Sequence, residues 1–416
     1  MAHAKLSPSS ASRWMTCQAS VVMQEGKADP QSVYSAEGTA AHFLAERCLL
    51  TDKDADHYLD DKISVRRWGD CHLNSEMDKG TYDDIEFSFK VDDDMVEYVN
   101  EYLSLVRSVR DSVEGELLVE QRLPLEDITG EKNAKGTSDV VILADKEIIV
   151  IDLKYGQGDK TDAVENPQLM IYGLSALLEF DIVGDFEAVR LIISQPRRQH
   201  VSEWVISAED LRAFGDRTRA IAANVLTLTP ESDLTGLFEP SALACKYCRA
   251  RFNCKAFADK ATTDIAAHFD DLDAAINKES ATFDDDRLVE LYKNINLYKL
   301  FTKTLDEAMY NRLQSGHEVE GFKLVKSKGG RRKWLDDDEA EGKLKRMRLK
   351  AEERYKKVLI SPTEAERLVK AGRIGDKQWE DLQDFITKSE GKPTIAPSDD
   401  KRNAIIPTVE MFDILD

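Results

Sequence analysis

The spacing of apolar residues predicts three helices in the first part of the chain. The segment from Ser7 to about Gln24 has helical spacing, with Ser7 as its N-cap and Pro8 in its first turn. A second helical pattern starts near Ser35, and a third covers residues 96–113. The N-terminal part is therefore expected to be helical.

From residue 116 the apolar pattern changes to that of strands. Three short runs rich in Val, Ile and Leu follow one another: ELLVEQRLPL, SDVVILAD and KEIIVIDLK. Residues 163–179 return to helical spacing, and VRLIISQP and HVSEWVIS predict two more strands. The order of helix, three strands, helix and two strands predicts an α/β fold, a mixed sheet flanked by helices.

The last third of the chain is expected to be mainly helical. A linker is predicted around residues 275–286, a long helix with a clear pattern over 288–313, and a short basic hairpin over 321–334. The tail after Glu390 has an irregular pattern. Because 416 residues exceed the usual size of one domain, the chain is divided into a first domain of residues 1–265 and a mainly helical C-terminal extension of residues 266–416.

Composition limits the cellular compartments in which the protein is expected. The apolar fraction is 42% and the charged fraction 32%, and no apolar run approaches the roughly 18 residues that span a membrane. The sequence starts without the apolar stretch of a secretory signal. We therefore expect a cytoplasmic protein, without a membrane partner, whose six cysteines do not form disulfides.

The net charge of −21 excludes a surface covered in phosphate-binding basic residues, but it leaves room for a local basic groove. Basic residues are densest between Lys323 and Lys357. This segment is expected to contact DNA or an acidic partner. A solvated helix face, paired with the acidic run of residues 336–339, explains it equally well.

Three charged residues stand at the ends of predicted strands. Asp152 and Lys154 lie two apart in IVIDLKYG and so share one face of an otherwise apolar strand. Asp139 closes the run GTSD, and a hairpin between the two strands would bring both carboxylates to one end of the sheet. Two carboxylates and an ammonium suit Mg²⁺- or Mn²⁺-dependent phosphodiester hydrolysis, although the tripeptide alone fits a surface ion pair too.

Neighbouring residues strengthen this interpretation. Glu120 lies in the preceding strand and is expected to join the carboxylates. Gln168 and Tyr172, four apart, present an amide and a phenol on one helix face. His42 shares a helix face with Glu46, and by itself is as well explained by a structural role.

In this order the motifs resemble the RecB-like branch of the PD-(D/E)xK nuclease superfamily. The family's G-T-x-x-H helix is similar to GTAAH ending at His42, and its glycine-x-x-aspartate strand end to residues 136–139. Its aspartate-x-lysine strand is similar to residues 152–154, and its glutamine-x-x-x-tyrosine helix to residues 168–172. Ser138 stands where the superfamily name places proline, which is ordinary in this branch. The resemblance covers residues 8–258.

The resemblance implies a restriction-endonuclease-like sheet and a role for each matched residue. His42, Asp139 and Asp152 would bind the metal, and Lys154 would act on the attacking water. Glu120, Gln168 and Tyr172 would support the catalytic site.

The cysteines give an independent signal. Cys245, Cys248 and Cys254 form C-x2-C-x5-C, which is too compact for unrelated buried thiols, and a metal or cluster site needs one more ligand. Cys17 is similar to the isolated N-terminal cysteine of iron-sulfur RecB-like nucleases, including the AddB type and a CRISPR-associated adaptation nuclease. A [4Fe-4S] cluster held by these four residues is the expectation, with a four-cysteine Zn²⁺ site as the alternative.

The sequence lacks the motifs of two other enzyme classes. GEKNAKGT at residues 130–137 lacks the order of a phosphate-binding loop, and no H-E-x-x-H occurs. The prediction is thus an ATP-independent, metal-dependent DNA nuclease. An exonuclease is expected rather than a site-specific endonuclease, because no base-reading module is recognisable. By resemblance it would serve phage or prophage recombination in a bacterial host cell, with recombination or single-strand-binding proteins as partners. The alternatives are a non-catalytic DNA-binding or scaffolding protein with the same fold, and a zinc-stapled protein with another enzymatic role.

Overall fold

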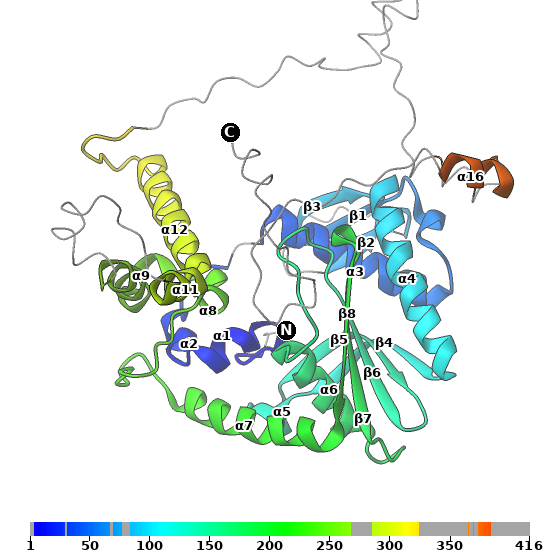
Figure 1. The fold of residues 1–416 in the computed structure, drawn as a ribbon, viewed down its shortest axis with the longest axis horizontal. Coiled ribbons are helices and arrows are strands. Elements are labelled where there is room, and N and C mark those ends of the chain that lie inside the picture. Colours follow the sequence, from blue (N-terminus) through cyan, green and yellow to red (C-terminus); the bar gives the residue numbers. More distant parts are fainter. Residues whose placement is uncertain are drawn as a thin grey trace, which may run out of the picture. The chain divides into compact units, whose positions relative to one another are not determined.

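A computed structural model describes residues 4–29, 31–66, 70–76, 84–267, 285–323, 365, 369 and 373–383. Its centre is a five-stranded sheet with the strands in chain order (Figure 1). The strands are β4 (Glu116–Pro124), β5 (Lys135–Leu143), β6 (Glu147–Leu153), β7 (Ala188–Gln195) and β8 (His200–Ser207). Only the pair β6 and β7 is parallel, so the sheet is mixed, as predicted.

The parallel pair follows from the composition of β6. Residues 148–153 are all buried, as expected for a strand covered on both faces. A parallel neighbour needs a crossover connection, and here it contains helix α6 (Pro167–Phe180). Asn166 caps this helix by accepting hydrogen bonds from the backbone of Gln168 and Leu169, and Pro167 occupies its first turn.

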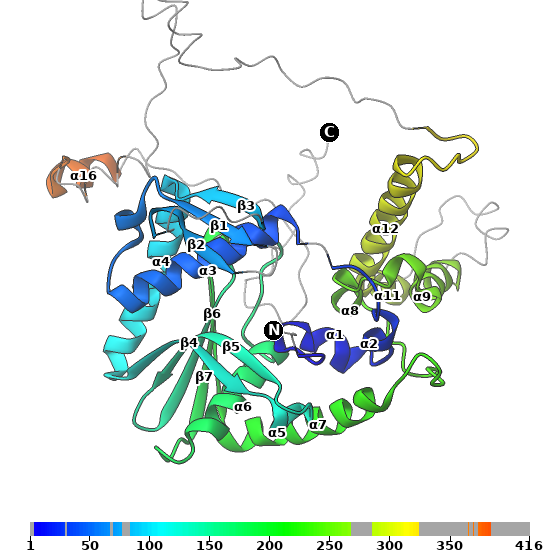
Figure 2. The same cartoon turned by 180° about the vertical axis from the view of Figure 1, so that it is seen from behind.

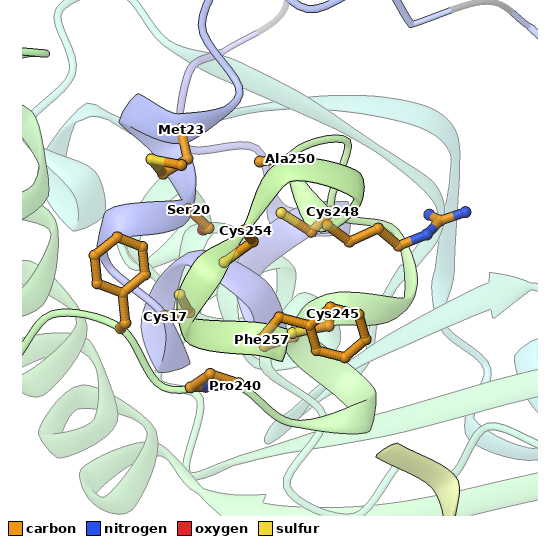
Figure 3. Close-up of a pocket in the computed structure, with 12 residues that line it drawn as sticks. Cys17, Ser20, Met23, Pro240, Cys245, Cys248, Ala250, Cys254 and Phe257 are labelled. Carbon is orange, nitrogen blue, oxygen red and sulfur yellow. The ribbon is translucent and has the colours of Figure 1, made fainter. Parts of the chain in front are cut away.

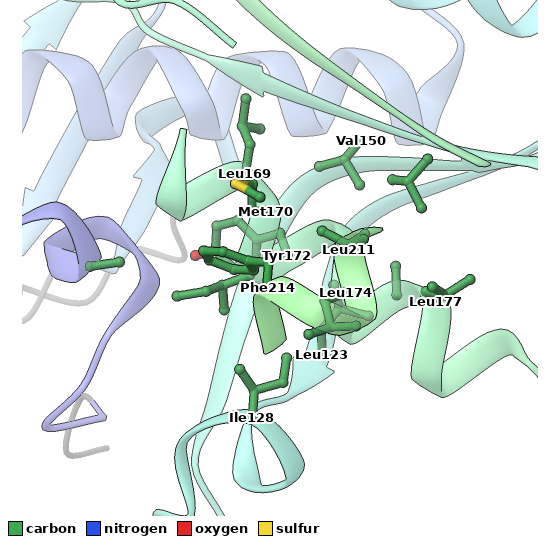
Figure 4. Close-up of a cluster of buried hydrophobic side chains, with 14 of the residues drawn as sticks. Leu123, Ile128, Val150, Leu169, Met170, Tyr172, Leu174, Leu177, Leu211 and Phe214 are labelled. Atoms are coloured by element: carbon green, nitrogen blue, oxygen red, sulfur yellow. The ribbon is translucent and has the colours of Figure 1, made fainter. Parts of the chain in front are cut away.

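Successive residues of β6 lie alternately in two hydrophobic clusters. Val150 lies in a cluster with residues of α6 and of α7 (Ala208–Thr227), together with Leu123 and Ile128 from β4 and α5 (Glu126–Thr129) (Figure 4). Ile149 and Ile151 lie in a second cluster with residues of α3 (Val33–Thr51) and α4 (Asp93–Val113). The strand period of two therefore builds one layer of helices on each face of the sheet (Figure 2).

A small three-stranded sheet accompanies α3 and was not predicted. It consists of β1 (Lys62–Arg66), β2 (Cys71–Leu73) and β3 (Ile85–Lys90), in the order β2-β1-β3. The short helical turns η2 (Ala55–Tyr58) and η3 (Asn74–Glu76) flank its strands, and η4 (Pro196–Arg198) joins β7 to β8. The buried residues Ile63, Val65 and Leu73 join the hydrophobic cluster of α3 and α4.

The N-terminal helix predicted from Ser7 to Gln24 is broken into pieces. The pieces are η1 (Pro8–Ser10), α1 (Ala11–Thr16) and α2 (Ala19–Met23). The break falls at Cys17, whose φ of −106° and ψ of 87° leave the helical region. Ser7 stands at the predicted N-cap position, but its side chain makes no capping hydrogen bond.

The segment after the main sheet forms α8 (Ala242–Lys246), η5 (Arg251–Asn253), α9 (Lys255–Ala267), α11 (Asp285–Lys293) and α12 (Ile295–Gln314). The single helix predicted over 288–313 is therefore interrupted at Asn294. α12 packs against the cysteine-bearing segment: Leu297 is 2% exposed, and the Phe257 and Phe301 rings meet edge to face at 5.6 Å.

The chain divides into two compact units, residues 1–324 and 325–416. The helices of residues 285–314 thus belong to the first unit, whereas the sequence placed the division after residue 265. In the second unit the described part is essentially α16 (Asp376–Gln383). The predicted linker at 275–286, the basic segment from Lys323 and the tail after Glu390 lie almost entirely outside the described residues. No helix in the described parts of the chain is long and apolar enough to cross a membrane.

Candidate active site and cysteine site

His42 reaches the end of the main sheet from α3. A capping box between Ser32 and Ser35 fixes the start of this helix, and its buried alanines pack on the sheet. His42 Nδ1 lies 3.2 Å from Asp139 Oδ1, at a separation of 97 residues along the chain. The helix and the hairpin therefore present their side chains to each other.

Asp139 is held through both of its carboxylate oxygens. β5 and β6 form the predicted antiparallel hairpin, with Val140 opposite Ile151. The backbone N–H of Leu153 donates to Asp139 Oδ2 at 2.7 Å, while Oδ1 faces His42. Burial opposes ionisation of Asp139, but the charge of His42 and these hydrogen bonds outweigh it and lower the pKa of the carboxyl group.

Glu120 lies across from Asp139 in an unusual backbone conformation. The flanking pairs are Val119 with Val140 and Gln121 with Ser138, and Glu120 itself has a φ of +49°. Such a residue costs on the order of 1–3 kcal/mol in backbone strain and is typical of functional sites. Ligand atoms of His42, Glu120 and Asp139 all lie within 4.8 Å of one another.

The pKa values of this group reflect its buried, closely spaced carboxylates. Burial, and then the charge of Asp139, raise the pKa of Glu120 to about 8. Burial lowers the pKa of His42, but Asp139 outweighs it and raises that pKa to about 9. A divalent cation would replace the protons on both groups, because metal ligands bind in their deprotonated forms.

Asp152, Lys154 and Gln168 form a second, adjoining group. Lys154 Nζ lies 2.9 Å from Asp152 Oδ2 and donates to Gln168 Oε1 at 2.9 Å. The Gln168 amide donates in turn to Asp152 Oδ1 at 2.9 Å. Burial raises the pKa of Asp152, and Asp152 raises the pKa of Lys154 against the effect of burial. The capped first turn of α6 thus fixes the Lys154 ammonium beside a buried carboxylate.

The predicted residues are therefore neighbours, but the structure groups them differently from the metal-binding and supporting roles that the resemblance implies. The metal set implied by the resemblance was His42, Asp139 and Asp152. In the structure Glu120 stands in the closest ligand group, while Asp152 contacts Lys154 and Gln168. The role of Asp152 as a metal ligand stays a prediction.

Tyr172 supports the site from the core. It is 8% exposed, and its ring packs so closely on Gly136 that a Cβ there would lie 2.8 Å from the ring. Figure 4 shows the ring among the leucines of α6 and α7. Burial, followed by the charges of Asp152, Asp139 and Glu120, raises the pKa of its phenol.

Two residues at this site were not assigned to it from sequence. Glu46 and Tyr102 line a small cavity together with His42, Glu120 and Asp139. Tyr102 is 1% exposed, and no described residue forms a hydrogen bond with its hydroxyl. The i, i+4 spacing of Glu46 after His42 was a visible signal, whereas Tyr102 looks like an ordinary core residue of α4.

The cysteine motif and Cys17 line one cavity, although more than 200 residues separate them in the chain (Figure 3). Cys17 follows α1, Cys245 ends the buried part of α8, and Cys254 follows η5. Met23, Phe238, Pro240 and Phe257 give the cavity apolar walls. Cys48 and Cys71 lie in the hydrophobic cluster of α3 and α4 instead.

Hydrogen bonds also join the two parts of this site. Ala19 N donates to Leu237 O at 3.1 Å, and Arg13 Nη1 donates to Tyr247 O at 3.1 Å. Arg249 bonds to Gln24 and to Lys27 O. The cysteines therefore meet at an interface that the protein already holds with direct contacts.

Several features of the cavity fit a thiolate-bound group. The buried Ser20 hydroxyl lines the cavity without a described hydrogen-bond partner, and so does Nε of Arg251. Burial raises the pKa of Cys245 to about 12 and raises that of Cys17 and Cys248. A metal group here would have to displace the thiol protons, because cysteine binds metals as thiolate. Arg251, which also forms an ion pair with Glu307, lies at the wall of the cavity.

Fold and site together define an α/β protein whose mixed sheet carries a histidine and carboxylate cluster beside a buried lysine–aspartate pair. A family model described as "Protein of unknown function (DUF2800)" matches residues 3–403, and the chain belongs to this family.

Two solved structures show remote similarity. The crystal structure of SSO0001 is 21% identical with a TM-score of 0.22, and the match covers 38% of this chain and 67% of that one. The crystal structure of protein VC1899 from Vibrio cholerae is 13% identical with a TM-score of 0.17, covering 53% of this chain and 54% of that one. Both TM-scores are too low to establish a shared fold.

Proposed function

We propose that this protein is a metal-dependent DNA nuclease of the PD-(D/E)xK type. The observation that carries the proposal is the meeting of His42, Asp139 and the group of Asp152, Lys154 and Gln168 at one end of the sheet. Four separate elements supply these side chains. An ordinary surface ion pair would not need a buried aspartate held by both a lysine and a glutamine.

His42, Asp139 and Glu120 would hold Mg²⁺ or Mn²⁺, with Asp152 as a further ligand on the neighbouring strand. Such an ion polarises a phosphate and lowers the pKa of bound water. Lys154 is held by Asp152 and Gln168, and its ammonium would orient the attacking water and stabilise the negative charge that develops on phosphate. Tyr172 keeps α6 seated on the sheet, and so keeps Gln168 in place.

We further propose that Cys17, Cys245, Cys248 and Cys254 hold a [4Fe-4S] cluster. The four cysteines come from two distant segments and line one cavity with apolar walls, which supports a shared metal group. A four-cysteine Zn²⁺ site stays the alternative. The unpaired Ser20 hydroxyl would donate to a cluster sulfide.

The proposed substrate is linear DNA, degraded from an end without ATP, in phage or prophage recombination inside a bacterial cell. Recombination or single-strand-binding proteins are the proposed partners. These points rest on the resemblance of the sequence motifs to RecB-like nucleases.

One assay tests the central proposal: purified protein with Mg²⁺ or Mn²⁺ on end-labelled linear DNA and on circular DNA of the same sequence. We expect release of short products from the linear molecule and little cleavage of the circle. Cleavage of both would indicate an endonuclease. Retained DNA binding without any cleavage would reject the proposal in favour of a DNA-binding or scaffolding role.

A further inference from the structure

The cysteine motif carries two side chains beside the proposed active site. Lys246 and Tyr247 stand between Cys245 and Cys248. The Tyr247 side chain is unusually open, with 70% of the residue exposed, and Lys246 Nζ lies 5.2 Å from the centre of its ring. An exposed aromatic ring beside a cation is a recurrent feature of surfaces that bind single-stranded nucleic acid.

This motif is tied to the loop that follows Lys154. Lys246 Nζ forms an ion pair with Asp159 Oδ2 at 2.8 Å. The same loop is braced from β7, because Gln195 Nε2 donates to the backbone oxygens of Gly156 and Asp159 at 3.1 and 3.2 Å. The cysteine segment therefore borders the catalytic strand end.

Tyr247 itself is fixed on both sides. Its neighbours Cys245 and Cys248 anchor the backbone in the cysteine cavity, and Arg13 Nη1 donates to its carbonyl oxygen at 3.1 Å. The backbone that carries the ring is thus fixed beside the loop that follows Lys154, while the ring itself faces solvent.

We propose that Tyr247 is a stacking platform for an unpaired base of a DNA strand that enters the site at Lys154, and that Lys246 contacts a phosphate of that strand. This inference rests on the proposed function and names the form of its substrate, a single strand. Every base offers a π-face, so such a platform needs no sequence preference. The Lys246–Asp159 ion pair is largely solvated, and exposed pairs are weak enough for a phosphate to replace the carboxylate.

The test measures binding separately from cleavage. Fluorescence anisotropy of an end-labelled single-stranded oligothymidylate, and of a blunt duplex, is recorded with Ca²⁺ replacing Mg²⁺, for the full chain as purified anaerobically. Tyr247→Ala is expected to weaken single-strand affinity about tenfold, the usual loss of one base stack. Tyr247→Phe keeps the ring and is expected to bind within about twofold of wild type. Tyr310→Ala, on α12 with a residue 53% exposed, is the matched control and should change nothing.

The outcomes separate this inference from the proposed function. Loss of single-strand affinity in Tyr247→Ala, with duplex affinity nearly unchanged, supports the platform even where wild-type protein fails to cut DNA. Equal losses for strand and duplex, an effect as large in Tyr247→Phe, or unchanged affinity in Tyr247→Ala overturns it, even where wild-type protein cuts DNA. The iron content and melting temperature of each variant are compared with those of wild type, as a control for folding. If Tyr247→Ala has less iron or a lower melting temperature, Tyr247→Leu takes its place in the same comparison.

Discussion

The Asp152 carboxylate is the most enclosed charge at the proposed active site, with 7% of its side chain exposed. Lys154 and Gln168 are its described partners, so a substitution here changes the chemistry of the site, and its effect on stability depends on which partner is lost. Asp152→Asn removes the charge but keeps an oxygen for the Gln168 amide. We expect it to lose several orders of magnitude in cleavage rate while its melting temperature stays close to wild type.

Lys154→Ala should differ from this variant in stability. It leaves Asp152 buried without its cation, which costs about 1–3 kcal/mol, moderated because Lys154 itself is partly solvated. Adding Asp152→Asn should recover that stability without recovering activity, and thermal unfolding of the two single variants and the double variant measures this coupling. A Lys154→Ala protein that keeps more than about a tenth of wild-type cleavage would show that the catalytic assignment is wrong.

Tyr102 offers a second test at the residue scale. Its hydroxyl is buried in the cavity of His42, Glu120 and Asp139 without a described partner. A buried polar group without a partner costs stability, and a functional role would explain why it is kept. We expect Tyr102→Phe to be as stable as wild type or more so. Cleavage should fall about two- to tenfold in kcat, the value of one hydrogen bond to an oxygen bound at the cavity.

Tyr98→Phe on the same helix is the matched control for Tyr102, because its ring packs in the same hydrophobic cluster. It should leave kcat unchanged. If both variants behave alike, the Tyr102 hydroxyl has only a structural role.

At the scale of elements, the sequence predicts those parts whose periodicity is strong. Each of the five main strands was expected within three residues of its observed bounds. Apolar runs such as that of β6 are too short to be read as buried helices, so they indicate strands. The small sheet was missed, since β2 is only three residues long and β3 has a mostly exposed pattern. The break at Cys17 was missed because tertiary contacts, and not a glycine or proline, end α1 there.

The candidate site was predictable to a similar degree. The sequence could predict that Asp139 and Asp152 lie together, because two strands joined by a short turn can pair in only a few registers. The observed register pairs Val140 with Ile151, next to these two residues. The positive φ of Glu120 has no sequence signal, because glutamate rarely adopts it, and so the closeness of Glu120 to His42 could not be derived. Tyr247 was passed over because an exposed tyrosine between two cysteines has no distinctive spacing.

The cysteine site makes a prediction about elements, because its ligands come from two distant segments. Cys17→Ser should abolish the brown colour of anaerobic protein, with its absorption near about 400 nm, and lower the melting temperature. Cys48→Ser is the control, since Cys48 is equally buried but lies in the cluster of α3 and α4. Colourless wild-type protein with stoichiometric zinc and no iron would establish the zinc alternative and leave the active-site proposal untouched.

At the scale of the whole molecule, the division of the chain depends on α12. The sequence predicts a linker around residues 275–286 and so favours a boundary before it, but it cannot show which surface the next helix covers. In the structure Leu297 and Phe301 of α12 pack on Phe257, and Arg251 forms an ion pair with Glu307 at 2.9 Å. The helix therefore covers the segment that carries three of the four cysteines.

The two boundaries make opposite predictions for shortened chains. A chain of residues 1–323 should bind iron and melt like the first unit of the full protein, whereas a chain of residues 1–267 should lose iron readily and melt at a lower temperature. The reason is that removing α12 exposes Phe257, and burial of one such side chain contributes about 1.5–3 kcal/mol. Leu297→Ala in the full chain makes the same test without truncation and should cost about 2–5 kcal/mol, while Leu305→Ala, 53% exposed on the same helix, should cost little. Iron content and melting temperature decide between them: equal values for the two shortened chains would place the boundary after residue 265, and α12 would then be an addition to a domain that is complete without it.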